Sequence, residues 1–283
     1  MPTAAMLLRK FNSVKTLPHV AIRLSKLISD EKSTMQDFEK MIRMDPTLVL
    51  RLLRLVNSPY YGLKQKVDSI SRAVVFIGMK NLRNLIVTDA LKEIFREDPA
   101  SEIFSRKKLW LHCAAVSICS QMISERIFGQ EGENAFLCGI LHDIGMIVED
   151  QVVRERFLQF CNTPKTDSSP ITQYERSIIG TDHCQVGHLL SRDWNLPVEV
   201  QEGIKRHHSI LEDVSPSSIT GIAQISEYIV SKLDYPAMPG MDPILSPPLA
   251  DHLRERLQEY RALAKDLPDE MSKAKELYES PEE

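Results

Sequence analysis

The stretch that decides the fold reads Phe136-Leu-Cys-Gly-Ile-Leu-His-Asp-Ile-Gly145. An apolar helical run leads directly into His142-Asp143, an imidazole beside a carboxylate. Adjacent side chains on a helix point about 100° apart, because one turn holds about 3.6 residues. Near a helix end the two groups can still converge on one ion, and Gly145 removes side-chain bulk just beyond them. The stretch therefore predicts a polar site at the end of a buried helix.

The same helical period runs through the rest of the chain. Leu48, Leu52 and Leu55 form one stripe, and a longer stripe runs from Leu82 to Ile94 after a break at Gly78. Further helices are predicted over residues 109–127, 134–148, 171–179, 183–194, 198–205, 215–230, 249–267 and 271–278. We find no alternating β-type run of useful length. The predicted fold class is therefore all-α, with two helical bundles in series.

Two irregular segments suggest how the chain is divided. Residues 96–102 are charged and contain Pro99, and residues 235–248 hold five prolines and Gly240. Segments of this kind interrupt helices and mark connections. We predict an N-terminal helical lobe over residues 1–105, a second helical lobe over 106–235, and a Pro-rich connector with C-terminal helices over 236–283.

Composition excludes several classes of protein. With 43% hydrophobic and 26% charged residues, the chain is unlike a disordered protein. No apolar run approaches the roughly 20 residues of a membrane span, and the N-terminus lacks the pattern of a secretory signal. The five cysteines are an odd number without a C-x-x-C pair, which favours free thiols in a reducing cytosol. We expect a cytoplasmic protein.

Histidine placement is the feature that points to chemistry. Seven of the eight histidines lie between His112 and His252. Imidazole and carboxylate ligands suit Zn, Fe, Mn or Ni when several elements converge on the ion. The alternative is a buried His142-Asp143 pair that is hydrogen-bonded without an ion, with the other histidines too far apart to share one.

Three further stretches, taken with the order of these histidines, carry a resemblance to a known family. They are Asp45-Pro46 through Asn57-Ser58-Pro59-Tyr60-Tyr61-Gly62, Ile70-Ser71-Arg72-Ala73 through Gly78, and His183-Cys-Gln-Val-Gly187 with Trp194-Asn-Leu-Pro197 and His207-His208. Together they resemble the HDOD domain, a signalling relative of the HD superfamily of metal-dependent phosphohydrolases. The resemblance covers about residues 15–235.

The resemblance implies an all-helical, two-lobed domain that reads or relays a signal. Carried over residue by residue, it implies that His112, His142 and Asp143 are the first metal ligands and that His183, His207 and His208 are added ligands. Two departures stand out. Glu227 is the nearest carboxylate where catalytic relatives have a late Asp, and because it is longer by only one methylene it is still expected to be a metal ligand. Met146 stands where HD-GYP phosphodiesterases have a Lys. No Gly-Tyr-Pro follows.

The sequence is compatible with three functions. The preferred one is a non-catalytic signalling module with a residual metal site, which would bind signalling proteins. The second is a metal-dependent phosphohydrolase acting on a nucleotide or cyclic nucleotide, with Asp143 as the bridging carboxylate. The third uses the basic residues 41–110 (13 Lys and Arg against 7 Asp and Glu) to bind nucleic acid, which we do not expect because no recognisable motif accompanies them. The C-terminal helices are expected to pack on the second lobe or to mediate self-association.

Overall fold

The computed structural model describes residues 2–14, 34–42, 46–95, 104–163, 170–233, 235–238 and 243–274. Within these ranges every regular element is a helix, so the predicted all-α class is confirmed. No helix in the described part of the chain has the length and apolar character needed to cross a membrane.

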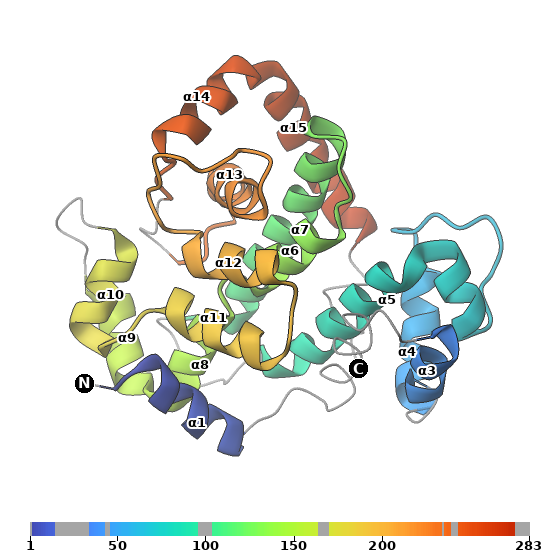
Figure 1. Cartoon of the computed structure of the whole chain (residues 1–283), viewed down its shortest axis with the longest axis horizontal. Helices are drawn as coiled ribbons and strands as arrows, with labels where there is room; N and C mark the ends of the chain where they lie inside the picture. The colour runs from blue at the N-terminus through green and yellow to red at the C-terminus, as the bar shows by residue number, and fades with distance from the viewer. Residues whose placement is uncertain are drawn as a thin grey trace.

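Two groups of helices make up the molecule (Figure 1). The smaller group holds α3 (Met35–Ile42), α4 (Pro46–Val56) and the first part of α5 (Ile70–Ile94), which then runs into the larger group. The larger group holds α6 (Arg106–Met122), the π-helical turn η1 (Ile123–Ile127), α7 (Glu133–Leu141), α8 (Ile144–Val152), α9 (Arg154–Asn162), α10 (Ile171–Ile179), α11 (His183–Asp193), α12 (Val198–Arg206) and α13 (Ile219–Ser231).

The ends of the chain pack on the larger group. Helix α1 (Ala4–Val14) buries Leu7, Leu8 and Phe11 and lies against α8 and α11. Helices α14 (Pro247–Glu255) and α15 (Leu257–Lys273) follow the connector, and α15 lies along α6. The lobe boundaries at residues 105 and 235 stay predictions, and the charged segment behind the first of them lies outside the described residues.

Helix α5 is bent at Gly78, where the backbone takes φ 77° and ψ 161°. A side chain is strained at such a positive φ, so glycine suits the position. The predicted break at this residue is confirmed, and α5 is physically two helical segments on either side of it.

The single helix predicted over residues 134–148 is wrong. Helix α7 ends at Leu141 and α8 begins at Ile144, with Asp143 between them at φ −100° and ψ 9°. The reason is tertiary, because the start of α8 packs against the backbone at the start of α11. A Cβ added at Gly145 would lie 2.0 Å from the carbonyl oxygen of His183. The break redirects the chain so that these two helix starts meet.

A second glycine brings α6 and α7 into backbone contact. A Cβ at Gly139 would lie 2.5 Å from the Cα of Ser117. Backbone atoms cannot move aside as a flexible side chain can, so both contacts require glycine. They place the end of α7 beside α6 and the start of α8 beside α11, which is where the predicted ligands lie.

Replacing Gly145 with alanine is expected to lower the free energy of unfolding by about 1–3 kcal/mol or more, since overpacking forces the backbone apart. Urea denaturation of the purified chain measures this. Gly187→Ala is the matched control, because the one tight contact of its added Cβ would be with a side-chain methyl of Ile204 at 3.0 Å, and the Ile144 methyl and the Gly145 backbone nitrogen lie at ordinary contact distances of 3.5 and 3.6 Å. Equal urea midpoints for Gly145→Ala and wild type would contradict the close packing described here.

Candidate metal centre

One pair of histidines joins α6 to α7. The Nε2 atoms of His112 on α6 and of His142, which follows α7, lie 3.2 Å apart. The opposite nitrogens are fixed by the backbone. Nδ1–H of His112 donates to the carbonyl of Tyr235 at 2.6 Å, and that of His142 donates to the carbonyl of Gly139 at 2.7 Å.

A second pair joins α11 to α12 in the same way. Nε2 of His183, the first residue of α11, lies 3.2 Å from Nε2 of His207, which follows α12. Nδ1–H of His207 donates to the carbonyl of Ile204 at 2.7 Å. Glu175 on α10 accepts twice from His183, from Nδ1–H at 2.7 Å and from the backbone N–H at 3.0 Å.

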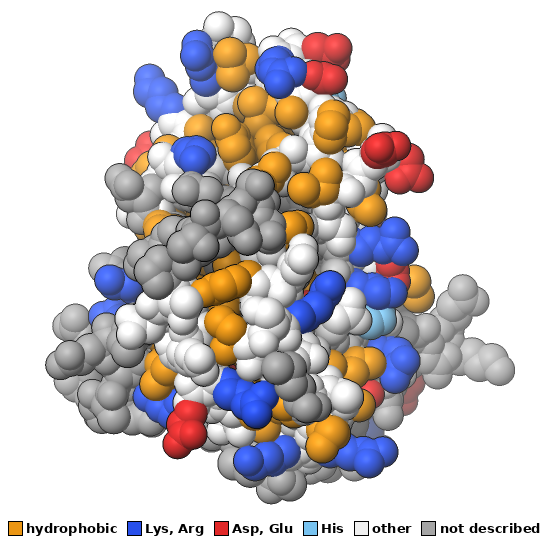
Figure 2. Space-filling view, turned by 90° about the vertical axis from the view of Figure 1, so that its left-hand side faces the viewer, with side chains coloured by type: hydrophobic (Ala, Val, Ile, Leu, Met, Phe, Trp, Pro, Cys, Tyr) orange, Lys and Arg blue, Asp and Glu red, His pale blue; other side chains and the backbone are white. Residues whose placement is uncertain are grey.

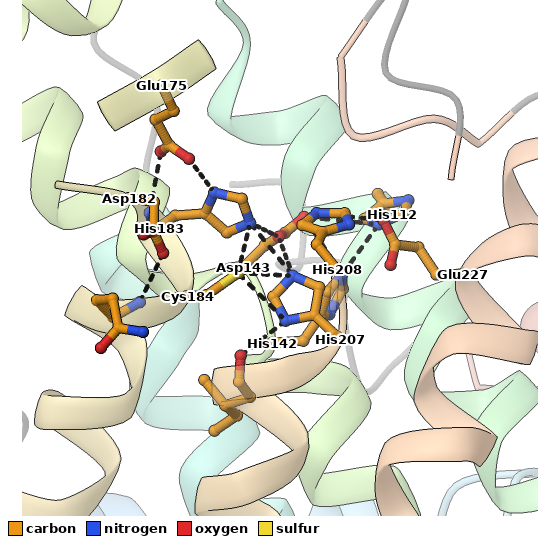
Figure 3. Close-up of polar contacts among 12 residues, drawn as sticks. His112, His142, Asp143, Glu175, Asp182, His183, Cys184, His207, His208 and Glu227 are labelled. Carbon is orange, nitrogen blue, oxygen red and sulfur yellow. Dashed lines mark hydrogen bonds and ion pairs between the residues drawn. The ribbon is translucent and has the colours of Figure 1, made fainter. Parts of the chain in front are cut away.

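Asp143 lies between the two pairs (Figure 3). Its Oδ2 is 3.6 Å from Nε2 of His112 and 3.2 Å from Nε2 of His142. Its Oδ1 is 3.4 Å from Nε2 of His183 and 3.5 Å from Nε2 of His207. The carboxylate is fully buried, and neither oxygen has a hydrogen-bond partner. Each oxygen therefore faces one imidazole pair and nothing else that could satisfy it.

His208 and Glu227 complete the cluster. The side chain of Glu227, on α13, is 2% exposed, and its Oε1 lies 3.6 Å from Nε2 of His208. Oε2 of Glu227 and Nε2 of His208 have no hydrogen-bond partner. All seven residues predicted from the sequence fall into two groups. Within each group, the potential ligand atoms all lie within 4.8 Å of one another. These groups are Asp143, His183, His207 and His208, and His112, His142 and Glu227.

The dispersed arrangement considered as an alternative is wrong, because ligands on one metal are separated by about 3–4 Å, as these nitrogens are. Fixing Nδ1 as a donor leaves the lone pair of Nε2 free in a neutral imidazole. Two such lone pairs 3.2 Å apart repel unless a cation lies between them. That cation is either a metal ion or an added proton. The donor set therefore fits a divalent metal, and the Nδ1 contacts are of the kind that orient metal-binding histidines.

Without a metal, the electrostatics favour protonation of one imidazole in each pair. Burial opposes protonation of His142, but the Asp143 carboxylate raises its pKa, whereas burial lowers the pKa of His112 to about 4. Likewise the pKa of His183 is raised well above its usual value by Cys184 and Glu175 despite burial, and burial lowers that of His207 to about 4. Burial alone would raise the pKa of Asp143, yet His142 and its neighbours hold it well below the usual range.

Sequence reasoning missed two neighbours of the cluster. Glu175 orients His183 from eight residues upstream, across the turn between α10 and α11, and no spacing rule singled it out. The Sγ of Cys184 lies 3.5 Å from Nε2 of His183. The sequence placed the cysteines only as free thiols, and all five are free.

The cluster is an internal site. His112, His142, Asp143, His183 and His207 are all at most 3% exposed. On the face of the described chain shown in Figure 2, no group of histidines reaches the surface, and apolar side chains gather at the level of α14. Access to the cluster would therefore run between side chains of the packed helices.

Comparison with known protein families shows to which family the chain belongs. The HDOD domain matches residues 14–210, more than half of the chain. The chain belongs to the HDOD family. This HDOD protein is 24% identical over 208 residues to an uncharacterized protein of Treponema pallidum, a match that covers 73% of the chain but only 40% of that relative.

Solved structures share the fold. A protein of Shewanella amazonensis named "Putative phosphohydrolase" has a TM-score of 0.69 at 23% identity, over 96% of both chains. A protein of Marinobacter aquaeolei named "Putative signal transduction protein" has a TM-score of 0.72 at 20% identity, over 96% of this chain and 61% of the other. A second Shewanella amazonensis protein, named "Putative metal-dependent phosphohydrolase", has a TM-score of 0.63 at 19% identity, over 98% of both chains. At these identities the likeness shows the fold.

Glu227 gives the metal-free protein a characteristic pH dependence. Burial raises the pKa of this carboxyl from 4.5 to about 8. Between these two pH values the folded protein keeps a proton that the unfolded chain has lost, so rising pH lowers the free energy of unfolding. In metal-free protein, Glu227→Gln is expected to remove this part of the decline between pH 5 and 8.

Urea midpoints at several pH values, in the presence of a chelator, measure the effect. Glu199→Gln is the control, because Glu199 is part of the surface and lies away from the cluster, at the start of α12. An unchanged pH profile in Glu227→Gln would show that the buried carboxyl does not titrate in this range.

Proposed function

We propose that this HDOD protein is a signalling module built around a centre for two divalent metal ions. The observation that supports it is the Asp143 carboxylate, whose two oxygens face different imidazole pairs and have no hydrogen-bond partner. His112, His142 and Glu227 would hold one ion with Oδ2 of Asp143. His183, His207 and His208 would hold the other with Oδ1.

The proposed signalling role follows from where the ligands come from. They are contributed by α6, α7, α11, α12 and α13 and by the turns next to them, so binding ties most of the larger helical group to one point. Metal binding would stabilise whichever packing of the helices brings the ligands together, by as much as its affinity differs between packings. Signalling partners would read that packing, as the name of the Marinobacter aquaeolei neighbour suggests.

A phosphohydrolase is the second candidate, and the same carboxylate supports it. When bound, a pair of divalent ions supplies Lewis acidity toward a water molecule and a phosphoryl oxygen. Asp143 would hold the two ions at a fixed separation, and two structural neighbours carry phosphohydrolase names. Against this, Met146 is fully buried where the HD-GYP pattern has a Lys, so that cation for a substrate phosphate is missing.

The metal content of the protein tests the centre. Purified wild type, supplied with Mn²⁺, Fe²⁺ or Zn²⁺ and then desalted, is expected to retain up to two ions per chain, and Asp143→Asn to retain fewer. Elemental analysis by mass spectrometry measures both. His188→Gln is the matched control, because His188 lies on the same helix as His183 but contacts the carbonyl of Gln201 instead of the cluster. Equal metal content in Asp143→Asn and wild type would refute the proposed centre.

Hydrolysis separates the two functions. Wild type loaded with Mn²⁺ or Fe²⁺ is expected not to hydrolyse bis(p-nitrophenyl) phosphate, nucleotides or cyclic dinucleotides, because Met146 supplies no charge to hold a phosphate. Turnover that is lost in Asp143→Asn, with folding intact by circular dichroism, would replace the signalling proposal by the phosphohydrolase.

Metal uptake is also expected to release protons. The raised pKa values of His142 and His183 favour an extra proton on each imidazole pair in the metal-free protein, and this proton competes with the ion, so affinity should fall as the pH is lowered. Calorimetric titrations in two buffers of different ionisation enthalpy count the released protons. Uptake without proton release would contradict the protonation described above.

A further inference from the structure

Cys184 has a position that neither the sequence nor the proposed ligand set accounts for. Its Sγ lies 3.5 Å from Nε2 of His183 and 3.8 Å from Nε2 of His207. The residue is buried at 2% exposure, and Figure 3 shows its sulfur beside these rings. We propose that Cys184 is a thiolate ligand of the ion held by His183 and His207, an inference that rests on the proposed metal centre.

The distances fit one tetrahedral ion. With bonds of about 2.05 Å to nitrogen and 2.3 Å to sulfur, tetrahedral angles place nitrogen and sulfur ligands about 3.5 Å apart, and two nitrogens about 3.3 Å apart. In the structure the Cys184 sulfur lies 3.5 and 3.8 Å from the Nε2 atoms of His183 and His207, and these two nitrogens lie 3.2 Å apart. Oδ1 of Asp143 lies 3.4 and 3.5 Å from the same nitrogens. The Cys184 sulfur and the Asp143 carboxylate oxygen thus both lie near the same two imidazole nitrogens, and His208 belongs to the same group of potential ligands.

Two effects act in opposite directions on the Cys184 thiol, because burial raises its pKa to about 12 whereas its place in the helix favours negative charge. Cys184 is the second residue of α11, an 11-residue helix, so its side chain lies in the first turn, where the helix dipole favours negative charge. In the metal-free protein the residue is therefore a neutral thiol, and its sulfur lies 3.5 Å from Nε2 of His183. As a ligand, Cys184 would give its thiol proton to solvent and would hold the ion through a sulfur lone pair.

Other buried thiols in the described chain have different surroundings. Cys138 contacts the carbonyl of Val200 at 4.0 Å, and Cys119 lies beside Ser226. Cys113 is the exception, since its sulfur lies within 4.8 Å of ligand atoms of His142 and Asp143. Cys113 therefore serves as the competing candidate, and Cys138 as the control.

A thiolate changes which metals the site prefers. Thiolate ligands favour Zn²⁺ and other soft or borderline ions, whereas carboxylate and water suit Mn²⁺ and Mg²⁺. We therefore expect the half of the centre around His183 and His207 to select Zn²⁺, Co²⁺ or Cd²⁺ over Mn²⁺.

Cobalt substitution of the full chain tests the ligand directly. Wild type titrated with Co²⁺ is expected to show the near-ultraviolet charge-transfer band of a cobalt–thiolate bond together with the visible bands of a tetrahedral ion. Cys184→Ser should still bind Co²⁺ but lose the charge-transfer band, whereas Cys138→Ser should keep it. In Cys184→Ser the affinity for Cd²⁺ should fall by at least about 10- to 100-fold, which is the loss seen when a residue that only orients a ligand is removed. The affinity for Mn²⁺ should change little.

The outcomes separate this inference from the metal centre itself. Absence of Co²⁺ uptake by wild type would refute the centre. Uptake of Co²⁺ without a charge-transfer band would refute Cys184 as a thiolate ligand and leave the metal centre intact. A band that is lost in Cys113→Ser but kept in Cys184→Ser would have the same meaning. If Cys184→Ser does not fold, X-ray absorption of wild type carrying Zn²⁺ decides, since a sulfur neighbour at about 2.3 Å is expected and a shell of only nitrogen and oxygen would overturn the inference.

Discussion

The buried charge of Asp143 is the constraint on which the rest of the site depends. An ionised carboxylate removed from water is costly unless cations or hydrogen-bond donors surround it. Here no backbone N–H or hydroxyl satisfies the two oxygens, and their polar neighbours are imidazole nitrogens. The cluster is therefore stable only while positive charge, as protons or metal ions, remains among those nitrogens. This requirement couples the folding of the larger helical group to the charge state of its centre.

Backbone contacts determine where that charge is held. Gly139 lets α7 approach α6 at Ser117, and Gly145 lets α8 approach His183 at the start of α11. Because backbone atoms meet at both points, neither contact can shift without moving a helix. The fixed Nδ1 partners of the histidines add a second level of constraint, since they aim the Nε2 atoms inward. The ligands are thus positioned by packing before any ion binds, which lowers the cost of ordering them.

Membership of the HDOD family and the altered surroundings of the cluster both support the proposed signalling role over the phosphohydrolase. The residues proposed as ligands lie close together, yet Met146 provides an uncharged, buried thioether where a phosphate-binding cation would stand in HD-GYP enzymes. In the proposed function, a centre without that cation would hold its ions for structural or regulatory reasons. The chain also spans only 40% of its Treponema pallidum relative, which is therefore considerably longer than the region that matches.

Hydrophobic periodicity in the sequence was enough to predict the helical fold class and the break at Gly78, whereas the seven polar residues that cluster were indicated by the resemblance to the HDOD family. Only the tertiary structure decided that helix 134–148 breaks at Asp143, and that Glu175 and Cys184 lie against His183. The physical reason is that such contacts depend on how closely separate helices approach one another. That approach is set by backbone packing at Gly139 and Gly145, which local periodicity does not encode.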